Sequence, residues 1–320
     1  AMINYEDFQV ARVFKANQNR FIEVEILPLA ELERVADYDA AIIFGRGLNL
    51  EPEQLAFLKS EGIKGLKMFM ESPTNPNIDV TNLRGQDLDY VADYLQYGGT
   101  LNYRYLLNYV RSEFDGKRLM ADAVKAPIAI SQDLVFHLDE EALFESVEAF
   151  QAYAAEQGIH KPGQPSVALI TSVPGPFNSN RDHVDGLIES LQDKGLNVFP
   201  LAALNKRLDF LKAIDPAAVI FMPHGRITLN EADEAIAWLK SQNVPLFGPV
   251  SVFQNHDEWK QDQQGMAGAL MTMSVVLPEF DGTITPYAIA AKYADEYGYQ
   301  IFKPIPERMD KFTRMVRHWV

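Results

Sequence analysis

Residues 165–201 read PSVALITSVPGPFNSNRDHVDGLIESLQDKGLNVFPL, and this pattern decides the fold. The apolar run 167–170 is typical of a strand that is buried on both faces of a parallel sheet. The segment 197–201 is the expected returning strand. Between them, four apolar residues recur at helical spacing and predict an amphipathic helix; they are Val184, Leu187, Ile188 and Leu191.

A strand, loop, helix and second strand in this order form a right-handed crossover. The loop 172–181 leaves the carboxyl end of the first strand, where Pro174 and Pro176 restrict the backbone and Gly175 allows a turn. Ser179 and Asp182 resemble a capping box at the start of the helix. Ligands of such sheets bind beyond the carboxyl ends of the strands. We therefore expect this loop and the helix N-terminus to line a binding site.

The composition is that of an ordinary globular protein, with 47% hydrophobic and 23% charged residues. The net charge of −15 argues against nucleic acid or an anionic membrane surface as the main partner. The chain contains no cysteine, which excludes disulfides, thiolate zinc sites and a cysteine nucleophile.

No apolar run approaches the ~18 residues of a membrane-spanning helix, so no transmembrane segment is expected. The opening residues AMINYEDFQV lack the charged-then-apolar pattern of a signal peptide. We expect a cytoplasmic location and leave open a signal or anchor ahead of Ala1. The amphipathic pattern at 306–320 reaches Val320 without a capping residue, as expected for a chain that continues.

The chain length of 320 residues suits two domains of ~150 residues. We predict two α/β domains with doubly wound, Rossmann-like or flavodoxin-like parallel sheets, joined by a helical connection. The segment Lys161-Pro162-Gly163 has linker composition, which places the boundary between 1–160 and 161–320. The first domain opens on a helical pattern. Its first strand is therefore expected to be missing or to come from a later segment.

Polar side chains follow consecutive predicted strands of the second domain. His224 directly follows a strand, and neutral imidazole binds metals well, although a bond to a neighbouring loop is an equal alternative. Arg226 suits a ligand carboxylate, and a solvated or structurally paired arginine is its alternative. His183 lies near a helix N-terminus, and a plain surface position is its alternative. The candidate binding residues are Asn178, Asn180, Arg181, His183, His224, Arg226 and Glu279, with His224 also the candidate metal ligand.

Strong catalytic motifs are absent from the sequence. It contains no Gly-x-Gly-x-x-Gly, no P-loop and no Gly-x-Ser-x-Gly. Two α/β domains are also found in nucleotide-sugar glycosyltransferases, so this function is an alternative. The lack of a glycine-rich phosphate loop counts against it. Residue patterns alone assign no catalytic residue.

The second half contains an ordered set of family motifs, of which VVLPEFDG at 275–282 is the clearest. Others are VDGLI at 184–188, DPAAVI at 215–220 and VPL at 244–246. In this order they resemble the large subunits of CobN-type cobalt chelatase and of magnesium chelatase, the latter known as the H subunit. In the first half, NYRYLLNY at 102–109 is similar to the amino-terminal part of CobN-like proteins from haem- and corrinoid-uptake settings.

The resemblance implies the amino-terminal part of a longer protein that binds a tetrapyrrole, namely a corrinoid, a porphyrin or haem. Members of this family insert Co²⁺ or Mg²⁺ with ATPase partner subunits, and some CobN-like members remove iron from haem. The implied partners are the remaining domains and the ATPase subunits. The implied catalytic centre lies mostly in those later domains, so this part alone is expected to be inactive. Residues 173–177 and 223–226 depart from the biosynthetic enzymes, which leaves specificity for cobalt open. The sequence does not name the metal or the direction of chelation. A non-catalytic docking or scaffold module of the same assembly is the alternative.

Overall fold

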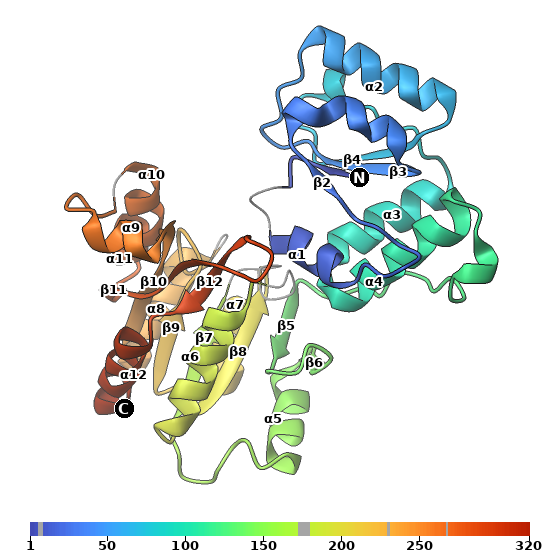
Figure 1. The fold of residues 1–320 in the computed structure, drawn as a ribbon. Helices are drawn as coiled ribbons and strands as arrows, with labels where there is room; N and C mark the ends of the chain where they lie inside the picture. Colours follow the sequence, from blue (N-terminus) through green and yellow to red (C-terminus); the bar gives the residue numbers. More distant parts are fainter. Residues whose placement is uncertain (6–8, 172–179, 229–230, 267) are drawn as a thin grey trace. The chain divides into compact units, whose positions relative to one another are not determined.

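The computed structural model describes residues 1–5, 9–171, 180–228, 231–266 and 268–320 (Figure 1). The chain divides into two compact units, 1–130 with 296–299 and 131–295 with 300–320. Each unit contains its own sheet, of four strands and eight strands respectively. This confirms the predicted α/β class with parallel sheets. Within the described residues, no helix has the length and apolar character needed to cross a membrane.

The sheet of the first unit is parallel, in the order β2-β1-β3-β4. Its strands are β1 (Met2–Ile3), β2 (Ile26–Leu27), β3 (Ala40–Phe44) and β4 (Lys67–Glu71). Its α-helices are α1 (Gln9–Ala16), α2 (Pro52–Lys64), α3 (Gln86–Tyr97) and α4 (Gly99–Tyr109). Shorter helical turns are the 3-10 helices Leu29–Asp37, Pro76–Ile78 and Arg118–Met120 and the π-helix Val110–Phe114.

The expectation that this domain lacks its opening strand, or borrows one from later in the chain, is wrong. Met2–Ile3 is that strand, and it pairs in parallel with both β2 and β3 at the centre of the sheet. Both residues are buried. A strand of two residues is too short to give a recognisable apolar run, because strand patterns are recognised over 4–8 residues.

The sheet of the second unit has the order β12-β11-β10-β9-β7-β8-β5-β6. The strands β8, β7, β9, β10 and β11 are mutually parallel and have the flavodoxin-like order 2-1-3-4-5. Antiparallel strands border them, with β12 on β11 and β5 on β8. The strands are β5 (Asp133–Phe136), β6 (Leu143–Phe144), β7 (Ser166–Ile170), β8 (Asn197–Ala203), β9 (Ala218–Phe221), β10 (Leu246–Asn255), β11 (Ile284–Ala294) and β12 (Gln300–Pro304).

The helix predicted between β7 and β8 is α6 (Asp182–Asp193), and its apolar stripe is buried as expected. Gly195 follows this helix with φ +78°, a left-handed conformation that suits glycine. Ser179 of the expected capping box lies outside the described residues. The other helices are α5 (Val147–Glu156), α7 (Arg207–Ile214), α8 (Ala232–Gln242), α9 (His256–Gln261), α10 (Gly268–Met271), the π-helix Thr272–Val276, α11 (Leu277–Phe280) and α12 (Pro306–Trp319).

Residues 131–160 belong to the second unit, whereas the linker composition at 161–163 suggested that they precede the boundary. β5 pairs with β8 through Val135 and Leu201, and the ring of Phe150 in α5 lies 5.5 Å from that of Phe199. The Asp133 carboxylate also accepts the backbone N–H of Leu204. The polar Lys161-Pro162-Gly163 turn therefore joins α5 to β7 inside one unit.

Candidate functional site

A crevice lies at the carboxyl ends of β7, β9 and β10 in the second unit. The chain runs from β7 outward to β8 and then returns to the other side of β7 to form β9, so β7 and β9 border the topological switch point. Ligands of doubly wound sheets bind at this point. The crevice has a volume of about 140 Å³. Its lining includes Thr171, His183, Met222, His224, Phe253 and Phe302.

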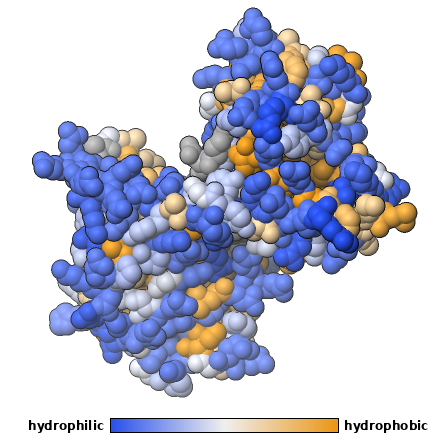
Figure 2. Space-filling model, in the orientation of Figure 1, coloured by the Kyte–Doolittle hydropathy of each residue, from blue (hydrophilic) through white to orange (hydrophobic). Residues whose placement is uncertain are grey.

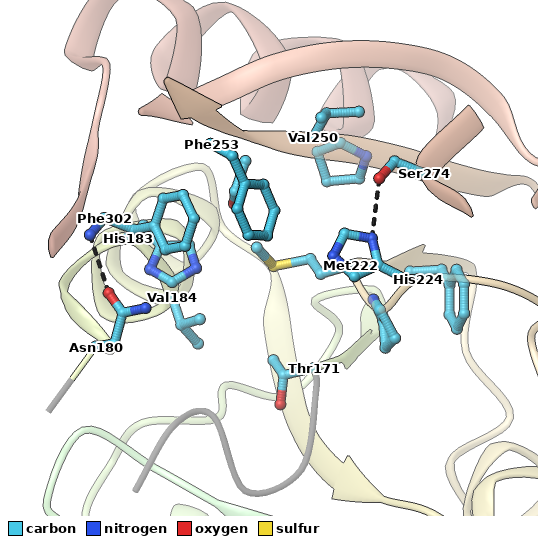
Figure 3. Close-up of a pocket in the computed structure, with 14 residues that line it drawn as sticks. Thr171, Asn180, His183, Val184, Met222, His224, Val250, Phe253, Ser274 and Phe302 are labelled. Carbon is cyan, nitrogen blue, oxygen red and sulfur yellow. Dashed lines mark hydrogen bonds between the residues drawn. The ribbon is translucent and has the colours of Figure 1, made fainter. Parts of the chain in front are cut away.

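His183 lies in the first turn of α6 and is 9% exposed. Burial lowers the pKa of its imidazole to about 4, so the ring is neutral at pH 7. Its Nδ1 has no hydrogen-bond partner among the described residues, and its ring centroid lies 5.3 Å from that of Phe302. In Figure 3 it faces His224 across the crevice, with Phe253 and Met222 between them. A neutral ring with an unused nitrogen can bind a ligand group.

His224 follows β9, and its side chain is exposed to the crevice. Its Nδ1 lies 2.9 Å from Oγ of Ser274, and either atom can be the donor (Figure 3). Partial burial lowers the pKa of His224 and favours the neutral ring. If Nδ1–H donates to Ser274, Nε2 has a free lone pair that can bind a metal. The ring also lies 5.7 Å from the Phe253 ring, measured between centroids.

Asn180 lines the crevice and links two elements that are distant in sequence. Its Oδ1 accepts the backbone N–H of Phe302 in β12 at 2.9 Å (Figure 3). This bond ties the start of α6 to the edge strand. Asn180, His183 and His224 are the predicted site residues that the structure brings together.

Arg181 is buried and bonded to other protein groups rather than directed into the crevice. The residue is 5% exposed, and its Nε and Nη2 atoms donate to the Asp185 carboxylate at 2.8–3.0 Å. Nη2 also donates to the carbonyl of His137 at 2.7 Å. Burial raises the pKa of Asp185, although Arg181 acts in the opposite direction. These contacts hold the first turn of α6 against the segment that follows β5, and Arg181 is not among the residues that line the crevice.

Two further candidates, Arg226 and Glu279, are not brought into the crevice. Arg226 forms an ion pair with Asp281. Glu279 is exposed in α11, and neither residue lines the crevice. Asn178 lies outside the described residues. Within the described part of the chain, no three His, Asp or Glu side chains gather as a metal site. His224 would therefore bind a metal only as a single ligand beside donors from another molecule.

Sequence reasoning missed the aromatic and hydroxyl residues of the crevice. Phe253 lies near the end of β10, which continues well beyond the VPL motif at 244–246. Phe302 lies in β12, whose five residues QIFKP follow a hairpin loop that contains Gly298 with φ +87°. The adjacent apolar pair Ile301 and Phe302, bounded by a glycine turn and a proline, is the signal that could have identified it. Ser274 lies in a π-helix, and local sequence gives no sign of its pairing with His224.

The fold and the crevice define the class: a protein of two parallel-sheet α/β units, one of them flavodoxin-like with an imidazole-lined crevice at its switch point. The family model of CobN/Magnesium Chelatase matches residues 92–320, which is more than half of the chain. The chain belongs to this family. The resemblance carried by the motifs around 275–282 is thereby confirmed.

Two curated relatives and one solved structure illustrate the relationship. The aerobic cobaltochelatase subunit CobN of Pseudomonas aeruginosa is 25% identical over 284 residues, which cover 83% of this chain and 22% of that protein. The H subunit of magnesium chelatase from Rhodobacter capsulatus is 27% identical over 166 residues, which cover 42% of this chain and 14% of that protein. The catalytic subunit of cobaltochelatase from Mycobacterium tuberculosis superimposes with a TM-score of 0.69 at 15% identity, covering 98% of this chain and 26% of that one, and so shares the fold. The chain spans about a quarter or less of each of these relatives.

Proposed function

We propose that this chain supplies part of the tetrapyrrole-binding surface of a CobN-like large chelatase subunit. The substrate would be a corrinoid, a porphyrin or haem, and the metal that is inserted or removed would be cobalt, magnesium or iron. The observation that carries the proposal is that the family match at 92–320 encloses the imidazole-lined crevice at the switch point. The remaining domains and ATPase subunits would supply the rest of the catalytic machinery.

The donor groups of the crevice suit a metal that a macrocycle already holds better than a free metal ion. A tetrapyrrole supplies its own ring nitrogens to the metal, so one imidazole from the protein is enough to complete an axial position. His224 offers such a single ligand, and no group of three or more metal-binding side chains accompanies it among the described residues. The Phe253 ring beside His224, together with the neutral His183 ring and the Phe302 ring, offers aromatic contacts in the same crevice.

An absorbance titration of the chain with haem, metal-free protoporphyrin and a corrinoid tests the proposal. We expect saturable binding of at least one of the three. For haem, His224→Ala should weaken binding by about tenfold or more, because an axial iron bond is lost, which corresponds to about 1.4 kcal/mol per factor of ten. Metal-free protoporphyrin should be affected much less. His318→Ala, an exposed imidazole in the last turn of α12, is the matched control.

Two outcomes would overturn the proposal. Equal losses in the His224 and His318 variants would show unspecific surface binding. No saturable binding of any of the three ligands would leave the docking or scaffold module as the better interpretation.

A further inference from the structure

A second and larger cavity lies in the same unit, with a volume of about 520 Å³. Residues of β10, β11, α9, α10, the π-helix and α12 line it, together with the segment just before α10. Among them are Val252, Trp259, Met266, Met271 and Arg308. Pockets that enclose small-molecule ligands occupy about 300–1,000 Å³. The larger cavity falls inside this range, and the crevice of about 140 Å³ falls below it. The crevice by itself cannot enclose a macrocycle.

The two cavities adjoin each other, because Val250 and Phe253 line both of them. Phe253 is 43% exposed, and its ring lies 5.7 Å from the ring of His224. Ser274 lines the crevice and the next residue, Val275, lines the larger cavity. A flat ligand in the larger cavity therefore has its edge beside the aromatic ring that His224 contacts.

The lining of the larger cavity is mostly apolar; its polar side chains are Gln254 and Arg308, and Arg308 is the charged one. Its guanidinium carbon is 4.1 Å from the Tyr287 ring centroid and 5.4 Å from that of Trp259, and Nε donates to the carbonyl of Ala288 at 2.6 Å. These contacts hold the guanidinium in one place and use only one of its donor groups. Within the described residues Arg308 forms no ion pair, although the chain carries a net charge of −15. A fixed guanidinium with free donors binds a carboxylate well.

We propose that the larger cavity holds the body of a flat, apolar macrocycle, with one of its carboxylates on Arg308 and its edge reaching the crevice past Phe253. This inference rests on the proposed function and adds where the tetrapyrrole lies and which of its groups is recognised. Neither Arg308 nor Met271 of α10 is among the binding residues proposed from the sequence.

Two methionines give a matched test of the location. Met271 and Met273 are each 40% exposed and lie two positions apart, but only Met271 lines the larger cavity. Met271→Trp fills the cavity and should raise the Kd for haem and for protoporphyrin by about tenfold or more. Met273→Trp should leave the Kd within about twofold of the unmodified chain. Equal affinity of the two variants would overturn the location.

The carboxylate contact is tested with protoporphyrin and its dimethyl ester, which lacks the negative charges, in the same detergent. The unmodified chain should bind the free acid about tenfold more tightly than the ester, because a hydrogen bond to a charged group is lost. Arg308→Gln should abolish this preference. Arg314→Gln should keep it, since Arg314 lies on the same helix, pairs with Asp310 and has a side chain that is 70% exposed.

Equal binding of acid and ester by the unmodified chain would overturn the role of Arg308 without any question of folding. His224→Ala separates the two proposals. If this variant loses haem binding while acid and ester bind equally, or while Met271→Trp binds normally, the proposed function stands and the ligand does not lie in the larger cavity. If no tetrapyrrole binds at all, both proposals fail together.

Discussion

Arg226, in the loop after β9, forms an ion pair with Asp281, which follows α11 in the sequence by one residue. The Asp281 side chain is fully buried, and its other oxygen accepts the backbone N–H of Ile227 at 2.5 Å. The pair thus joins the loop that carries His224 to the helical segment that carries Ser274. The sequence left Arg226 open between a ligand carboxylate and a structural role, and the structure shows a structural ion pair.

Asp281→Ala should therefore lower the free energy of unfolding by about 1–3 kcal/mol, because it leaves the Ile227 N–H without its acceptor and Arg226 without its partner. Urea unfolding followed by circular dichroism measures the change. Asp257→Ala is the control, since the Asp257 side chain is 85% exposed. A change below about 0.5 kcal/mol, the usual size for a surface substitution, would contradict this account of the pair.

Gly248 in β10 lets Thr283 pack directly against the backbone of this strand. A Cβ at this position of β10 would lie 2.3 Å from Cγ2 of Thr283, a contact that real side chains do not make. Gly248→Ala should cost about 1–3 kcal/mol through overpacking. Adding Thr283→Ser removes the clashing methyl group and should recover most of the loss. Thermal unfolding of Gly248→Ala, of Thr283→Ser and of the double variant measures this recovery. If the double variant is no more stable than Gly248→Ala, the clash with the Thr283 methyl group is not the cause of the loss.

His183 should make stability depend on pH. The ordinary pKa of histidine is about 6.5, and burial lowers that of His183 to about 4. Between these values only the unfolded chain takes up the proton, so stability falls as the pH falls from about 6.5 to about 4. The loss between pH 7 and pH 5 should be about 2 kcal/mol.

The measurement compares urea unfolding at pH 7 and pH 5 in the unmodified chain and in His183→Asn. The variant should lose about 2 kcal/mol less over this interval, because its side chain does not titrate. His318→Asn, which changes an exposed histidine, should keep the full pH dependence. An identical pH dependence in all three proteins would show that His183 is not held neutral.

Ser274 should tune His224 as a metal ligand. Removing the hydroxyl in Ser274→Ala takes away the partner 2.9 Å from Nδ1 that orients the ring. Partners of metal-binding histidines typically contribute about tenfold or more in affinity, so haem binding should weaken by about that factor. Binding of metal-free protoporphyrin should not change. Thr272→Ala, an exposed hydroxyl in the same helical segment, is the control, and a similar effect of both variants on haem would refute the role of Ser274.

The sequence predicted the central unit of the second sheet because the signals there are local. Apolar residues at 167–170 and the stripe from Val184 to Leu191 identify β7 and α6 without reference to the rest of the chain. The same reasoning placed the crevice, since the carboxyl ends of parallel strands meet at one edge. Of the candidate residues, His183, His224 and Asn180 do line it.

The other features depend on contacts between distant residues. Whether Arg181 and Arg226 face a ligand or a carboxylate depends on Asp185, the carbonyl of His137 and Asp281, and the sequence does not show which of these lie nearby. The two-residue strand β1 is defined by its neighbours in the sheet rather than by its own composition. Phe253 and Phe302 reach the crevice through the length of β10 and the register of β12, which are set by pairing.

Figure 2 shows hydrophilic side chains over much of the visible surface of the second unit, which disfavours self-association. The antiparallel strands that border its parallel sheet disfavour self-association in a second way. β5 covers β8 on one side and β12 covers β11 on the other, so neither outer parallel strand presents a free row of N–H and C=O groups. Exposed rows of this kind are templates for aggregation. A version of the second unit that began at residue 161 would lack β5 and β6, so the edge of β8 that pairs with β5 would be exposed. It should therefore self-associate through that strand, whereas one that keeps residues 131–160 should stay monodisperse.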